Sequence, residues 1–99
     1  MINSIIINRS HQAVPSNCET LPSELIDNLD NLEKPFETCS KIVQHIISKG
    51  FDTVYLHLLP TNFQAQLIAD LRATTMTRTV FFATVDEDHK HSGWIETTL

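Results

Sequence analysis

Residues 36–50 carry the clearest periodic pattern in the chain, and this pattern constrains the fold more than any other segment. Apolar residues recur there at intervals of three and four positions: Phe36, Cys39, Val43, Ile46 and Ile47. This spacing places them on one face of an α-helix. Glu37 precedes Lys41 by four residues, which supports the helix, and Gly50 supplies a C-terminal stop. The pattern predicts an amphipathic helix whose apolar face contributes to the core.

Short β-type runs and two further helical segments surround this helix. The runs 2–8, 52–59, 77–85 and 94–99 are short and rich in β-branched or aromatic residues, so we predict strands there. The run 52–59 also fits a helical face, but Pro60 disfavours helical geometry in the residue before it. A helix therefore remains the alternative for 52–59.

Helical spacing appears at 21–33 and again from 61 to about 73. Pro35 either starts the helix of residues 36–50 at its first turn or kinks the helix before it. The run Thr61-Asn62-Phe63-Gln64 has the form of a capping box, in which the Thr hydroxyl and the Gln amide satisfy free backbone groups.

The predicted order of elements is strand, helix, helix, strand, helix, strand, strand. A chain of 99 residues supports a single hydrophobic core. We therefore predict one small α+β domain over residues 1–99, with a mixed sheet and helices packed on one face. The predicted core consists of Phe36, Val43, Ile46, Ile47, Phe63, Leu67, Leu71, Val80 and Phe82.

The charge balance argues against several partners. Twelve acidic residues against seven basic ones give a formal net charge of −5, and the bases are spread singly along the chain. Without a basic stripe to neutralise phosphates, direct nucleic-acid binding is disfavoured. The apolar runs are too short to cross a bilayer, and the N-terminus lacks a secretory signal, so we expect no membrane contact and a cytoplasmic location.

Two cysteines, Cys18 and Cys39, are separated too widely for a Cys-x-x-Cys motif. In a cytoplasmic protein we expect both to be reduced thiols, with Cys39 as a small core residue. Two isolated cysteines do not supply the four ligands of a structural zinc site. We predict no cofactor and no redox role.

Acidic residues are concentrated in one segment. Six of the twelve acids lie between Glu19 and Glu37, where Lys34 is the only base. In the predicted helix 21–33 they recur every three residues, at Glu24, Asp27, Asp30 and Glu33. Such a stripe is most often the solvent face of an amphipathic helix. The functional interpretation is a surface that docks on a basic protein, because opposite charges attract over long range.

The run Asp86-Glu87-Asp88-His89-Lys90-His91 is the densest polar stretch, and it should form the turn between two strands. Its acids Asp86, Glu87 and Asp88 are a second candidate for partner contact. His89 and His91, with Asp86, offer a weak alternative site for zinc, nickel or copper. A metal needs a third or fourth fixed ligand, so a solvated hairpin tip is the preferred interpretation.

The sequence contains no Gly-x-Ser-x-Gly elbow, Gly-rich phosphate loop or His-Glu-x-x-His helix. Spatial neighbours such as a dyad of His57 with Asp52 are invisible in a sequence, and we expect His57 to line a strand face or the core instead. Because catalytic motifs are absent, we expect no enzyme. The preferred hypothesis is a small acidic protein-binding module: an inhibitor, an adaptor or an immunity or anti-defence protein of the class that phages and mobile elements often encode. The alternative is a small enzyme or metal-binding protein that uses residues 86–91. The sequence indicates no particular oligomeric state.

Overall fold

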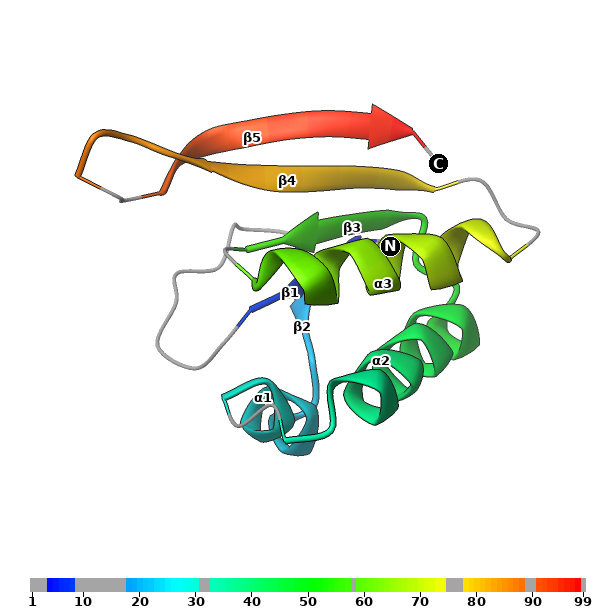
Figure 1. Cartoon of the computed structure of the whole chain (residues 1–99). Coiled ribbons are helices and arrows are strands. Elements are labelled where there is room, and N and C mark those ends of the chain that lie inside the picture. The colour runs from blue at the N-terminus through cyan, green and yellow to red at the C-terminus, as the bar shows by residue number, and fades with distance from the viewer. Residues whose placement is uncertain are drawn as a thin grey trace.

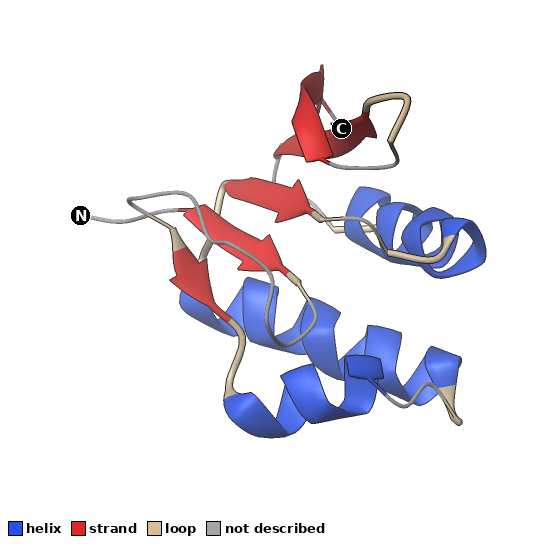
Figure 2. Cartoon of the chain, turned by 90° about the vertical axis from the view of Figure 1, so that its left-hand side faces the viewer, coloured by secondary structure: helices blue, strands red, loops and turns tan. Residues whose placement is uncertain are grey.

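Five strands form one mixed sheet, and the helices of the described chain all lie on one of its faces (Figure 1 and Figure 2). The computed structural model describes residues 4–8, 18–30, 33–57, 59–74, 78–88 and 91–98. The strands are β1 (Ser4–Ile7), β2 (Glu19–Thr20), β3 (Thr53–Leu56), β4 (Thr79–Val85) and β5 (His91–Thr98). The helices are α1 (Ser23–Asp30), α2 (Pro35–Lys49) and α3 (Thr61–Arg72).

The strand order across the sheet is β2-β1-β3-β4-β5. The first four strands in this order run parallel, and β5 pairs with β4 in the antiparallel direction. Parallel neighbours need a crossover connection, and α3 provides it between β3 and β4. The predicted α+β class, order of elements and one-sided packing of helices are confirmed. The short strand β2 is an addition to the predicted order of elements.

Local chemistry explains where the main elements begin and end. In β3, Val54 and Leu56 are buried in the core while Tyr55 is half-buried on the opposite face, so the period-two interpretation of 52–59 is confirmed. Pro35 is the first residue of α2, which separates α2 from α1. Gly50 ends α2 in the left-handed conformation at φ 70°, and its N–H donates to the carbonyls of Ile46 at 3.0 Å and Ile47 at 3.2 Å.

The predicted capping box at the start of α3 is wrong. Pro60 occupies the capping position, so Thr61 is already the first helical residue and no side chain caps the helix. The amide of Gln64 donates instead to the carbonyl of Leu59, at 2.7 Å. This bond satisfies the backbone carbonyl of Leu59, just before the helix, with a single side chain, whereas a capping box would satisfy two backbone N–H groups with two side chains.

The core lies between the sheet and the helices. From the predicted core, the structure buries Val43, Ile46, Phe63, Leu67, Leu71 and Val80, and Phe82 packs against them half-buried. The prediction that Phe36 and Ile47 lie in the core is wrong, because their side chains are 72% and 43% exposed. The buried stripe of α2 runs from Thr38 to Ile46 and includes Ile42. Phe36 precedes this stripe in the first turn, and Ile47 lies at its margin.

In the part of the chain that the structure describes, no helix has the length and apolarity needed to span a bilayer.

Candidate functional site

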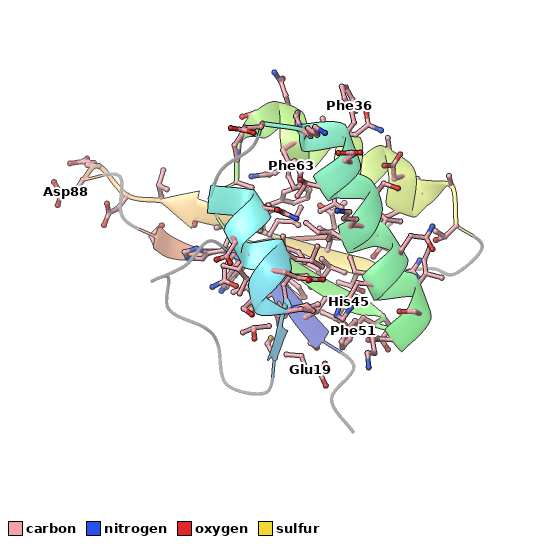
Figure 3. All side chains as sticks on the ribbon, turned by 90° about the horizontal axis from the view of Figure 1, so that it is seen from below. Glu19, Phe36, His45, Phe51, Phe63 and Asp88 are labelled. Carbon is pink, nitrogen blue, oxygen red and sulfur yellow. The ribbon has the colours of Figure 1, made fainter. Side chains whose placement is uncertain are left out.

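The first turn of α2 presents an aromatic ring to solvent. Figure 3 shows Phe36 projecting from the rim of the molecule, whereas Phe63 of α3 points inward. Between the two helices lies a mostly apolar hollow of about 240 Å³, lined by Pro35, Phe36, Asn62, Phe63 and Gln66. A ring this exposed contributes little to folding stability. A single exposed apolar residue is common on protein surfaces, but here the ring borders an apolar hollow, which makes this surface the candidate for a contact.

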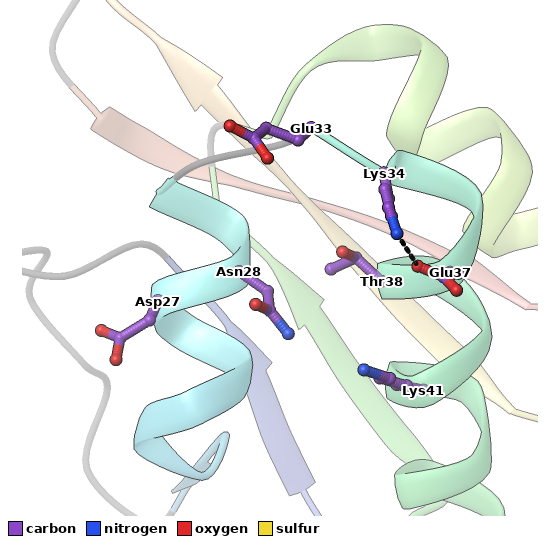
Figure 4. Close-up of a pocket in the computed structure, with 7 residues that line it drawn as sticks. All are labelled: Asp27, Asn28, Glu33, Lys34, Glu37, Thr38 and Lys41. Carbon is purple, nitrogen blue, oxygen red and sulfur yellow. Dashed lines mark ion pairs between the residues drawn. The ribbon is translucent and has the colours of Figure 1, made fainter.

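A second hollow lies on the opposite side of α2, between α2 and α1 (Figure 4). It has a volume of about 340 Å³, and charged or polar side chains line it: Asp27, Asn28, Glu33, Lys34, Glu37, Thr38 and Lys41. Lys34 and Glu37 form an ion pair of 3.8 Å, but both side chains are largely exposed, so the pair adds little stability. The start of α2 thus separates an apolar hollow from a charged one.

The predicted acidic stripe is only partly an acidic surface. Glu24 and Asp27 are exposed on α1, and Glu33 follows the helix, exposed at the edge of the charged hollow. Asp30 is the last residue of α1, and its side chain lies outside what the structure describes. Lys34 and Lys41 share the hollow, so its lining is mixed in charge with a small excess of carboxylates.

The acidic residues predicted at the turn between the last two strands lie away from α1 and α2. Asp86, Glu87 and Asp88 are exposed at the tip of the β4–β5 hairpin, where the N–H of Asp88 donates to Oδ1 of Asp86 at 2.9 Å. This bond makes an Asx-type turn. Figure 3 shows Asp88 projecting at one end of the molecule, and none of the three hairpin acids lines the charged hollow between α1 and α2. The structure therefore does not place them in the same hollow as Asp27 and Glu33.

The weak metal alternative stays an untested prediction. His89 lies outside the described residues, and so does the side chain of His91, the first residue of β5. Among the side chains that are described, no three from His, Cys, Asp and Glu converge closely enough to hold a metal ion.

The structure does not bring His57 and Asp52 together, and it buries His57 in agreement with the expectation that this side chain lines a strand face or the core. Asp52 precedes β3 and accepts a hydrogen bond from Oγ1 of Thr53 at 3.0 Å, whereas His57 follows the strand. A strand rises about 3.3 Å per residue, so their backbones are roughly 16 Å apart. His57 is buried instead, with its ring centroid 5.9 Å from that of Trp94.

Cys39 is confirmed as a core residue. Burial, followed by the hydrogen bond that Sγ donates to Asp70 at 3.4 Å and by the charge of Asp70, raises the pKa of its thiol to about 12. The thiol is therefore protonated at neutral pH, whereas a nucleophile or metal ligand needs the thiolate. Cys18 and Cys39 form no disulfide with each other in the structure.

Sequence reasoning missed an aromatic cluster on the face of the sheet opposite the helices. The rings of Tyr55 and Phe81 stack with centroids 4.6 Å apart, and Trp94 meets Tyr55 edge-on at 5.0 Å. Register creates this cluster, since Tyr55 pairs with Phe81 and Trp94 lies opposite Ala83. The three aromatic residues are visible in the sequence, but only the order and register of the strands show that they are in contact.

Comparison with protein-family models, with curated proteins and with solved structures finds no match to this chain.

Proposed function

We propose that this chain is a small acidic protein-binding module, an inhibitor, adaptor or immunity-type protein that acts by occupying a partner's surface rather than by catalysis. The observation that supports this proposal most strongly is Phe36, an aromatic side chain that is 72% exposed beside an apolar hollow. Protein interfaces commonly depend on a few aromatic anchors surrounded by a polar rim. The start of α2 offers this combination, because charged side chains lie next to the ring.

The apolar hollow and the charged hollow would serve different purposes in such a contact. An apolar side chain of the partner would pack against Phe36 and exclude water, which contributes most of the affinity. The carboxylates of Asp27, Glu33 and Glu37 would meet basic groups on the partner. Lys34 and Lys41 would require acidic groups at matching positions, and this mixture favours one partner over others.

The net charge of −5 supports a partner with a basic surface, because it attracts such a protein during the encounter. Nucleic acid and anionic membrane would be repelled. The free cysteines fit a reducing compartment, so we place the interaction in the cytoplasm.

The first test removes the anchor. The tagged protein captures its partner from the native host, and the affinities of wild type and Phe36→Ala are then compared. We expect a loss of about 2 kcal/mol or more, which is about a 30-fold rise in Kd. The matched control is Val85→Ala, which truncates another exposed apolar side chain, far from α2. An unchanged Kd for Phe36→Ala would refute this surface.

The second test addresses the charges. Reversal of Asp27 and Glu33 to Lys should slow association at low salt, and the matched reversal of Glu87 and Asp88 at the hairpin tip should have a smaller effect. High salt should remove the difference, because the Debye length falls from about 10 Å at 0.1 M to about 3 Å at 1 M. Equal association rates for wild type and the α1–α2 reversal at low salt would leave the carboxylates as an ordinary solvated face.

A further inference from the structure

Strand β5 is a long and unprotected edge of the sheet. It occupies the last position in the strand order and pairs only with β4 among the described strands, and in Figure 1 no element lies beyond it. An edge strand presents a row of backbone N–H and C=O groups that another strand can pair with. Proteins usually block such edges with proline, charged side chains or a bulge. The segment 92–98 contains no proline and one charged residue, Glu96, and the register shift lies near the hairpin end, at Thr84 and Val85.

The helix-side face of β5 carries one large apolar residue, Ile95, between Gly93 and Thr97. Ile95 lies directly opposite Phe82 and is 58% exposed, so it extends the apolar surface of β4 to the free edge. Beside Phe82 is a mainly apolar hollow of about 400 Å³, lined also by α3 residues that include Ile68. The charged group lining this hollow is Arg72. A side chain placed opposite Ile95 should therefore be apolar rather than basic.

The other face of β5 has different chemistry. Glu96 lies opposite Phe81 and is exposed, and Trp94 lies two residues before it on the same face. A basic side chain on this face would pair with the carboxylate and could lie against the indole ring. A strand added beside β5 would therefore place apolar side chains on one face and basic side chains on the other. Because successive side chains of a strand point to opposite faces, its sequence would alternate between apolar and basic residues.

We infer that β5 receives an extended segment of a basic protein, which adds a strand to the sheet and carries alternating apolar and basic side chains. Backbone hydrogen bonds supply affinity in this mode, and the alternating side chains supply specificity. Charge selects this occupant over a second copy of the chain, because each copy carries a net charge of −5. The edge is separate from the Phe36 surface and can be tested without it.

The test uses a short synthetic peptide of alternating lysine and valine with blocked ends. Trp94 is the only tryptophan of the chain and lies on the proposed strand, so its fluorescence reports binding directly. We expect saturable binding to wild type. A peptide with methylated backbone nitrogens along one edge should bind about tenfold more weakly or worse, because it loses hydrogen-bond donors but keeps its charge.

Two protein variants separate local recognition from general attraction. Glu96→Lys should weaken peptide binding by about fivefold, whereas Glu24→Lys, which changes the net charge equally but lies on α1, should weaken it much less. The inference is overturned if the methylated peptide binds as well as the parent, if both variants weaken binding equally, or if the peptide does not bind. It is also overturned if sedimentation shows that β5 pairs with a second copy that the peptide does not displace. The methylated peptide needs only wild-type protein, so this arm does not depend on the variants folding.

Discussion

Ile46 and Ile47 are neighbours on α2, and the sequence pattern predicts both in the core, yet the structure exposes 0% of one and 43% of the other. Truncating each to alanine removes the same atoms and gives the same small gain in helix propensity. The difference between the two variants therefore isolates burial. At Ile46 the loss includes the transfer of the removed groups and the cavity left behind, about 2–5 kcal/mol. At Ile47 much of the side chain is already in water and no closed cavity forms, so we expect a loss of about 1 kcal/mol or less.

Urea denaturation, followed by Trp94 fluorescence and far-ultraviolet circular dichroism, measures both losses. A domain of this size has a free energy of unfolding of about 5–15 kcal/mol, so Ile46→Ala should remove a large share of it. The two melting temperatures should differ by roughly 4 °C or more, at about 4–8 °C per kcal/mol. Equal losses for Ile46→Ala and Ile47→Ala would show that α2 is rotated from the orientation described above.

Two further predictions concern titration and metal. Because the pKa of Cys39 is raised in the folded state, the protonated thiol contributes stability that is complete below pH 9.0, the ordinary thiol pKa, and that is lost as pH rises toward about 12. Over this pH range the free energy of unfolding should fall more for wild type than for Cys39→Ala. Parallel plots of unfolding free energy against pH for the two proteins would contradict the prediction. Calorimetry with zinc or nickel should show no submicromolar binding, since His89 and His91 are neighbours in the sequence and supply only two ligands. Tight metal binding that is lost in the His89→Ala, His91→Ala double variant would refute this prediction.

Much of the fold follows from local patterns, because these patterns reflect local forces. Proline at the start and glycine at the end define α2, and the alternation in β3 separates Val54 and Leu56 from Tyr55. The strand β2 escaped prediction because it is two exposed residues held by pairing with β1, and no hydrophobic pattern marks it. The order of the strands is likewise a property of tertiary packing, which the sequence pattern does not encode locally.

The candidate surface was harder to predict than the fold. Periodicity assigns a residue to a helix face, but it does not say how far the neighbouring layer extends along that face. Phe36 satisfies the period and still projects into solvent, because the buried part of α2 begins only at Thr38. The acidic spacing singled out Asp27 and Glu33, which both line one hollow, but it could not show that Lys41 of α2 lines the same hollow.

The position of β1 has a consequence for how the chain folds. Although it is the first strand in the sequence, it lies inside the sheet between β2 and β3, and its three isoleucines, Ile5, Ile6 and Ile7, are fully buried. On the ribosome this strand emerges long before β3, its main partner, has been made. We expect the local unit of β3, α3 and β4 to assemble early and β1 to dock late, because closing a long loop slows non-local pairing. Until then an apolar strand is exposed, so chaperone binding and aggregation should concentrate at β1.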